Sequence, residues 1–157
     1  VETVWSSAAA LEEQVLDADL IIGAVLIPGA AAPKLVGLDL VRKLQKGSVM
    51  VDVAIDQGGC FETSRATSYE DPTYEIEGVV HYCVANMPGG VARTATLALT
   101  NATLPYVMRL ADRGLDALRS DPHFALGLNV YAGRLTHQGV GEAFNFDTVS
   151  PEDALKV

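Results

Sequence analysis

The stretch SVMVDVAIDQGG, residues 48–59, decides the fold expected for this chain. Its first nine residues are apolar apart from Ser48, Asp52 and Asp56, which is typical of a buried strand of a parallel sheet. Asp52 interrupts the run, and Asp56 ends it directly before an amide side chain and two glycines. We therefore expect a buried strand over residues 48–56 that brings a carboxylate to its carboxyl end.

Two further apolar runs flank this strand. Residues 20–26 (LIIGAVL) are continuously apolar, which predicts a strand covered by helices on both faces. Residues 79–86 (VVHYCVAN) form a third expected strand, and amphipathic patterns predict helices over residues 6–18 and 38–47. Residues 57–78 are rich in turn formers and are expected to form a long loop. Strands that alternate with short helices predict an α/β fold with a parallel sheet.

The pattern changes at Thr94, where the strand signature is lost. The following residues predict a long helix that is kinked or restarted at Pro105 and ends at Gly114, followed by short helices and an irregular tail. SDPHF, residues 120–124, has the form of a capped helix start. The segment TATLALTNATLPYVM, residues 94–108, is apolar enough for a subunit interface, but a helix packed within its own subunit would show the same pattern.

Composition excludes several classes of partner. The 157 residues carry a net charge of -9, with 11 basic against 20 acidic side chains and no basic cluster, so neither nucleic acid nor an anionic membrane surface is an expected partner. No apolar run reaches the roughly 20 residues of a membrane-spanning helix. Cys60 and Cys83 fit no zinc spacing, and we expect free thiols in a reducing compartment, the cytoplasm. Because the chain opens at Val1, we expect a processed product or a piece of a longer protein.

The three expected strands each end in small or polar residues, in GAVLIPG (23–29), AIDQGG (54–59) and CVANMPG (83–89). Ligands of open parallel sheets bind outside the carboxyl ends of the strands, so a site is expected where these ends meet. Asp56 could orient a substrate or handle a proton there, or it could cap its own turn. Asn86 likewise could bind a cofactor or satisfy its own loop, whereas Asp52 is expected to be structural.

The histidines give weaker signals. His81 lies inside an apolar run and is expected to be a hydrogen-bonded core imidazole. His123 is expected at a helix start, and His137 lies in the irregular tail. No two histidines have metal-ligand spacing, so no metal site is expected. The phosphate-binding and dinucleotide glycine fingerprints are missing as well.

Four segments together resemble the carboxyl-terminal half of alanine dehydrogenase. They are ADLIIGAVLIPGAAAPKLV (18–36), GSVMVDVAIDQGGCFETSRATSYEDPTY (47–74), HYCVANMPGGVARTATLALTNATLPY (81–106) and LADRG (110–114). The resemblance implies an NAD-dependent enzyme that interconverts L-alanine with pyruvate and ammonia. It also implies that the chain acts with the amino-terminal half of the same enzyme in a cytoplasmic homohexamer.

The resemblance also implies a domain division. Residues 1–93 would be the carboxyl-terminal part of an NAD(H)-binding Rossmann domain, containing the second half of its parallel sheet. Residues 94–157 would be the connecting helix and the carboxyl-terminal segment of the substrate domain. The glycine fingerprint, the catalytic histidine and the Lys and Arg that bind the substrate carboxylate would then lie upstream.

Carried over position by position, the resemblance assigns Asp56 as the active-site aspartate, which would hold the amino group or the attacking water. The cofactor-binding positions that it implies are Ala24, Val25, Leu26, Val53, Asp56, Val84, Asn86 and Met87.

Two alternatives stay open. The soluble NAD(H)-binding domain of proton-translocating nicotinamide nucleotide transhydrogenase is similar, but it usually carries Gln or Glu at the position of Asp56. Asp56, Cys60 and VANMPGG therefore favour alanine dehydrogenase. The second alternative is a non-catalytic half of a Rossmann domain that only assembles with partners.

Overall fold

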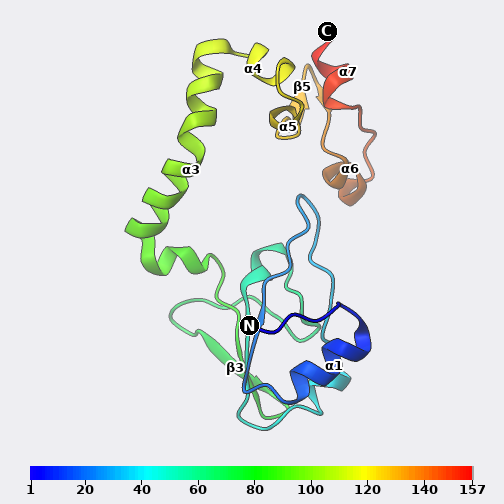
Figure 1. The fold of residues 1–157 in the computed structure, drawn as a ribbon, viewed down its shortest axis with the longest axis vertical. Coiled ribbons are helices and arrows are strands. Elements are labelled where there is room, and N and C mark those ends of the chain that lie inside the picture. Colours follow the sequence, from blue (N-terminus) through cyan, green and yellow to red (C-terminus); the bar gives the residue numbers. More distant parts are fainter. Residues whose placement is uncertain (157) are drawn as a thin grey trace. The chain divides into compact units, whose positions relative to one another are not determined.

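A computed structural model describes residues 1–156 and divides into two compact units (Figure 1). The first unit comprises residues 1–27 and 31–90, and the second comprises residues 28–30 and 91–156. Each unit has its own group of buried apolar side chains.

The elements of the first unit are α1 (Ala8–Leu16), β1 (Leu20–Gly23), α2 (Leu38–Val41), β2 (Val49–Asp52), the 3-10 helix η1 (Val53–Gln57), β3 (Thr73–Ile76) and β4 (Val79–Tyr82). A second 3-10 helix, η2 (Met87–Val91), leads into the second unit. The elements of the second unit are α3 (Ala92–Arg113), α4 (Asp116–Arg119), α5 (Pro122–Ala125), β5 (Val130–Tyr131), β6 (Arg134–Leu135), α6 (Gln138–Phe144) and α7 (Pro151–Leu155).

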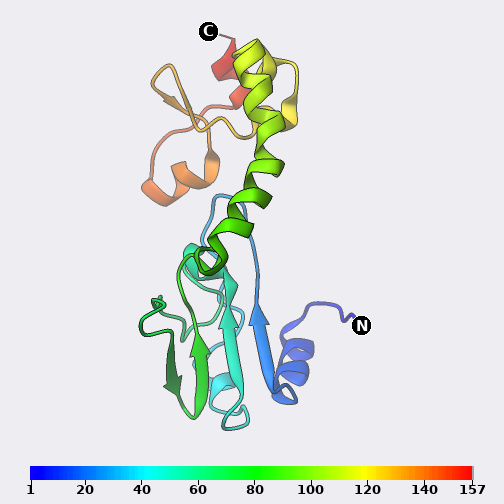
Figure 2. The ribbon, with the colours of Figure 1, turned by 90° about the vertical axis from the view of Figure 1, so that its left-hand side faces the viewer.

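The sheet of the first unit has the strand order β1-β2-β4-β3 (Figure 2). β2 pairs in parallel with β1 on one side and with β4 on the other. Gly23 lies opposite Asp52, and Val51 lies opposite Tyr82, so the three parallel strands end close to the same level. The expected parallel α/β fold is confirmed, and so is the expectation that the three strand ends are neighbours.

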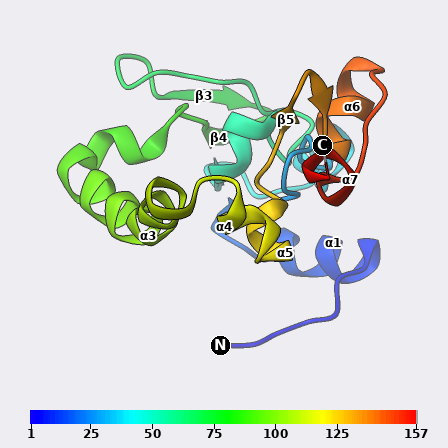
Figure 3. The ribbon, with the colours of Figure 1, turned by 90° about the horizontal axis from the view of Figure 1, so that it is seen from above.

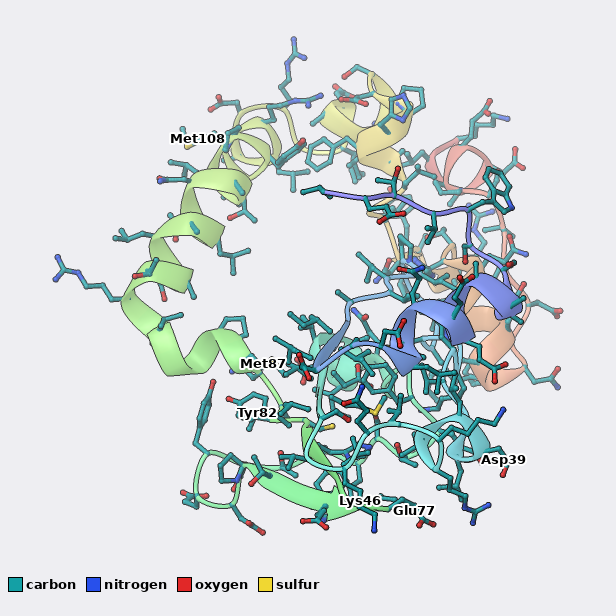
Figure 4. All side chains as sticks on the ribbon, turned by 60° about the horizontal axis from the view of Figure 1, so that its bottom comes forward. Asp39, Lys46, Glu77, Tyr82, Met87 and Met108 are labelled. Carbon is teal, nitrogen blue, oxygen red and sulfur yellow. The ribbon has the colours of Figure 1, made fainter. Side chains whose placement is uncertain are left out.

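The expectation of a loop over residues 57–78 was wrong for its last part. Thr73–Ile76 forms β3, which pairs antiparallel with β4 through a tight turn at Glu77 and Gly78. Both turn residues have positive φ, 54° and 81°, which suits the right-handed twist of a hairpin. The backbone N–H of Gly47 donates to the carbonyl of Gly78, and Lys46 packs beside this turn (Figure 4).

The strands are shorter than expected, and only one face of β1 is buried. Ile21 is buried with Met50 and Val15 in the core, whereas Leu20 and Ile22 are 54% and 60% exposed. The expectation of a strand covered on both faces was therefore wrong for the residues that the structure describes. Successive side chains of a strand point to opposite faces, and here the core occupies one of them.

The helix α3 runs without a break from Ala92 through Pro105 to Arg113, so it does not restart at the proline. It ends before Gly114, as expected, and the φ of that glycine is +54°. None of its side chains is fully buried, and Met108, labelled in Figure 4, is 51% exposed. The subunit interface on this helix stays a prediction. Within residues 1–156, no helix has both the length and the apolar character needed to cross a bilayer.

The rest of the second unit is more regular than its sequence suggested. Asp121 caps α5 by accepting hydrogen bonds from the N–H groups of His123 and Phe124, which confirms the capped start in SDPHF. The β5–β6 hairpin and the helices α6 and α7 were not expected from the sequence, which predicted short helices up to residue 133 and an irregular tail after it (Figure 3). Leu118, Ala125 and Leu155, from α4, α5 and α7, form the buried cluster of this unit.

Asp52, the last residue of β2, is fully buried. One of its carboxylate oxygens accepts a hydrogen bond from the backbone N–H of Cys60 at 2.8 Å and another from the hydroxyl of Ser64. The N–H of Phe61 approaches the same oxygen at 3.4 Å. These bonds tie the loop after β2 to the strand itself, and the expected structural role of Asp52 is confirmed.

We predict that Asp52→Ala lowers the free energy of unfolding by about 3 kcal/mol, because it leaves buried donors without an acceptor. Ser48→Ala is the matched control. The Ser48 hydroxyl is buried without a hydrogen-bond partner among residues 1–156, so its removal should change the stability by less than about 0.5 kcal/mol. Urea unfolding measures both. Equal stabilities of the two variants would contradict the role of Asp52.

Candidate functional site

Asp56 does not lie on a strand. β2 ends at Asp52, and the chain then tightens into η1, whose first turn contains Asp56. The expected strand over residues 48–56 was therefore too long. The turn ends at Gly58 and Gly59, whose φ angles are +91° and +74°. A Cβ on Gly59 would come within 2.8 Å of the Asp52 carboxylate, so the glycine is required by both its backbone angle and the close approach.

Lys34 holds the end of η1 in place. Its Nζ donates to the carbonyl oxygens of Gly58 at 2.6 Å and Gly59 at 2.8 Å. Carbonyl groups at the end of a helical turn lack partners and attract a cation. The backbone N–H of Ala32 also donates to the Gln57 carbonyl, so the loop after β1 supports the loop after β2. The role of Lys34 was not expected, because nothing in the local sequence pattern indicates a partner 24 residues away.

Asp56 joins the end of β2 to the loop after β4. Its two carboxylate oxygens accept from the backbone N–H of Asn86 at 3.0 and 3.2 Å. Asn86 has φ +51°, a left-handed conformation that is uncommon outside glycine. Asp56 therefore binds the neighbouring strand end and does not cap its own turn. Both residues are exposed, so their side chains can also meet a ligand.

The other expected site residues divide into exposed and buried positions. Ala24, Leu26 and Val53 are exposed, and the apolar side chains of Leu26 and Val53 lie beyond the ends of β1 and β2. Val84 is completely buried, so it supports this edge of the sheet from the interior and offers no exposed surface to a ligand. Val25 is half-buried and packs against the core. Met87, the remaining expected residue, is half-buried and begins η2.

This edge of the sheet can accept a ligand that has both a flat apolar part and polar groups. Leu26 and Val53 offer apolar surface, while Asp56 and Asn86 offer a carboxylate and an amide. A nicotinamide ring with its carboxamide and ribose has this combination of surfaces. The residues present therefore fit the nicotinamide end of a dinucleotide.

His81 is a core residue, as expected. It is completely buried, and its ring nitrogens lie 2.8 Å from the Thr63 hydroxyl and 3.0 Å from the Val79 carbonyl oxygen. Its ring stacks on Tyr74 with the centroids 5.0 Å apart. Burial lowers the pKa of His81, so the ring is neutral near pH 7. His137 caps α6 with its side chain, a role that its place in the tail did not indicate.

Both cysteines are free, as expected, and both are buried. Burial, together with the neighbouring Asp52 carboxylate, raises the pKa of the Cys60 thiol to about 11. Since the thiolate is the nucleophilic form, Cys60 is a poor nucleophile near pH 7. Residues 1–156 contain no group of three His, Cys, Asp or Glu side chains that could hold a metal ion.

Comparison with known proteins identifies related sequences. Residues 1–138 match the family described as alanine dehydrogenase/PNT, C-terminal domain. The chain is 63% identical over 150 residues to an alanine dehydrogenase of Halomonas elongata, which covers 95% of this chain and 40% of that protein. It is 54% identical over 158 residues to an alanine dehydrogenase of Staphylococcus haemolyticus, which covers 99% of this chain and 42% of that protein. The chain thus spans about two fifths of the length of these relatives.

Two solved structures are similar as well. One, an L-alanine dehydrogenase, aligns with a TM-score of 0.73 and 57% identity over 89% of this chain and 39% of the other. The second, a transhydrogenase from Sinorhizobium meliloti, aligns with a TM-score of 0.63 and 25% identity over 85% of this chain and 36% of the other.

The burial of His81 predicts how the stability of the protein depends on pH. The pKa of His81 is lowered in the folded protein and returns to about 6.5 on unfolding, so below that pH the unfolded chain binds a proton that the folded chain does not. Stability contributed by the neutral ring should therefore be lost as the pH falls from 7 to 5, by at most about 1.4 kcal/mol per pH unit.

Urea unfolding of wild type and His81→Gln at both pH values measures this contribution. The variant should show the smaller loss of stability on acidification. His123→Gln, at an exposed position, should behave like wild type. An equal pH dependence in wild type and His81→Gln would contradict the assignment.

Proposed function

Since the chain belongs to the family of alanine dehydrogenase/PNT C-terminal domains, we propose that it is part of an NAD-dependent alanine dehydrogenase. Such an enzyme interconverts L-alanine with pyruvate and ammonia. The observation that carries this proposal is the 63% identity to an alanine dehydrogenase over 95% of the chain. The three adjacent strand ends support it, because this is the edge at which open parallel sheets bind ligands.

NAD is the proposed cofactor. When bound, it would accept a hydride from the α-carbon of alanine and leave an imine that water hydrolyses. The residues proposed to hold it are Ala24, Val25, Leu26, Val53, Asp56, Val84, Asn86 and Met87. Val84 is completely buried and would support the site from the interior, whereas Leu26 and Val53 would offer exposed side chains to the ring.

Asp56 is the proposed catalytic residue. Its carboxylate would hold the substrate amino group or the water that attacks the imine. The Asn86 N–H occupies only part of the hydrogen-bonding capacity of this carboxylate, since a carboxylate has about four acceptor positions. Asp56 can thus keep the loop after β4 in place and also accept a hydrogen bond from an N–H or O–H group of the substrate. His81 is buried in the core, and the resemblance assigns proton transfer to a histidine of the amino-terminal domain.

The domain division and the assembly are also proposals. Residues 1–93 would belong to the NAD(H)-binding Rossmann domain, and residues 94–157 would form the connecting helix and part of the substrate domain. The amino-terminal half of the same enzyme would complete the active site. The family resemblance further supports a cytoplasmic homohexamer, and the exposed apolar side chains of α3 fit a subunit interface.

The transhydrogenase alternative has weaker support. The solved transhydrogenase is 25% identical to this chain, against 57% for the solved alanine dehydrogenase. The third candidate, a non-catalytic half of a Rossmann domain, differs in a measurable way. The full-length protein would form no NADH from NAD when alanine is supplied. An alanine dehydrogenase would form it, and would consume NADH in the presence of pyruvate and ammonia.

We predict that Asp56→Ala in the full-length enzyme lowers the turnover number by about 10²- to 10⁴-fold, the usual contribution of a positioned acid or base. Asp56→Asn should lose a comparable factor, although it retains an acceptor for the Asn86 N–H. This pair separates the charge from the structural contact. Asp71→Ala, at an exposed loop position of the same unit, is the control and should keep wild-type turnover. Alanine-dependent NADH absorbance measures all three, and wild-type turnover in Asp56→Ala would contradict the assignment.

A further inference from the structure

The turn that follows β4, residues 86–90, is held by side chains from outside it. The Gly89 N–H donates to the Asn86 carbonyl at 2.8 Å and closes the turn. Asn86 itself has φ +51°, which costs free energy for a residue with a side chain. Asp56 holds the first N–H of the turn, as described above. A strained turn of this kind keeps its shape only when its surroundings fix it.

Tyr69 is the second residue that fixes this turn by hydrogen bonds. Its hydroxyl donates to the Met87 carbonyl at 2.5 Å and accepts from the Gly90 N–H at 2.9 Å. One side chain thus binds an acceptor and a donor at two places in the same turn. Met87, labelled in Figure 4, begins η2, which leads directly into α3.

The position of Tyr69 is set by its own loop. Two residues earlier, the Thr67 N–H donates to the Cys83 carbonyl, and the Thr67 carbonyl accepts from the Ala85 N–H. The Thr67 hydroxyl also donates to the Pro72 carbonyl at 3.0 Å. The loop that carries Tyr69 is therefore fastened to the chain just before the turn, and the tyrosine reaches across it.

The fit at Gly90 is close. A Cβ at this position would lie 2.8 Å from the Tyr69 hydroxyl oxygen and 3.1 Å from its ring, so the absence of a side chain lets the hydroxyl reach the backbone. Tyr69 is 50% exposed, and its ring is not part of the buried core of the unit. Its contribution therefore lies in the two hydrogen bonds of the hydroxyl more than in packing.

We propose that Tyr69 is a positioning residue that fixes residues 86–90 so that Asn86 and Met87 meet the nicotinamide end of NAD. This inference rests on the proposed function, which assigns those two residues to the cofactor. It also explains how Asp56 can serve the substrate. A neutral hydroxyl keeps the turn in shape when the carboxylate shares its oxygens with a substrate amino group.

Tyr69→Phe in the full-length protein tests the proposal, because it removes one oxygen atom and leaves the ring. Tyr106→Phe, on α3, is the matched control. Tyr106 is also 50% exposed, and its ring lies against Phe124. Hydrogen–deuterium exchange of a peptide covering residues 86–91, measured without ligand, should become faster in Tyr69→Phe only. The affinity for NADH, measured by fluorescence titration, should fall by about tenfold, because the loosened turn must be ordered again when NADH binds. The KM for NAD should rise by a similar factor, with kcat changed less than about threefold.

A double-mutant cycle with Asn86→Gly distinguishes positioning from a general structural role. Glycine accepts the positive φ and still offers the backbone N–H to Asp56. If Tyr69 acts through the turn, Tyr69→Phe should weaken NADH binding less in the Asn86→Gly background than in wild type. Equal losses in both backgrounds would overturn the positioning role.

The other possible results distinguish a failure of the role of Tyr69 from a failure of the proposed function. Unchanged exchange in Tyr69→Phe would show that the hydroxyl does not hold the turn, and would overturn the inference. Faster exchange with unchanged NADH affinity would overturn it as well, because the turn would then not serve the cofactor. A wild-type protein that binds no NADH would overturn the proposed function itself and, with it, the role of Tyr69 toward NAD.

Discussion

The buried carboxylate of Asp52 is the constraint on which the site depends. It ends β2 and binds the backbone of Cys60 and the hydroxyl of Ser64, so the chain must turn back immediately after the strand. That return forms η1 and places Asp56 on its exposed side. Asp56 then binds the Asn86 N–H and fixes the end of β4 relative to β2. One buried charge therefore determines where the exposed charge lies.

Support and function are divided among neighbouring residues of this unit. Asp52 and Lys34 bind opposite kinds of backbone group in the loop after β2, because the carboxylate takes N–H groups and the ammonium takes carbonyls. Neither needs to meet a ligand. Asp56 and Asn86 are exposed and also bind each other, so any ligand contact must coexist with that bond. The hydroxyl of Tyr69 fixes residues 86–90 through two further hydrogen bonds, so Asp56 can contact a ligand while it stays bonded to Asn86.

The sequence was informative wherever short-range pattern determines structure. The apolar runs predicted β1, β2 and β4, and their parallel order predicted that their ends are neighbours. The structural roles of Asp52 and His81 also followed from their positions within these runs. β3 was missed because its four residues lie among turn formers, and the Glu77-Gly78 turn after it is not one of the dipeptides that usually mark a two-residue hairpin. Contacts of Lys34, Tyr69 and Asn86 could not be predicted, because each joins a side chain to a backbone group that lies 18 to 30 residues away in the sequence.

We propose that the adjacent ends of β1, β2 and β4 form the nicotinamide site of an alanine dehydrogenase. The most direct measurement is a crystal structure of the full-length protein with NADH. We expect the nicotinamide ring at these strand ends, with Asp56 and Asn86 within hydrogen-bonding distance of the nicotinamide, its ribose or a substrate analogue. A nicotinamide bound elsewhere, with Asp56 remote from it, would contradict the account.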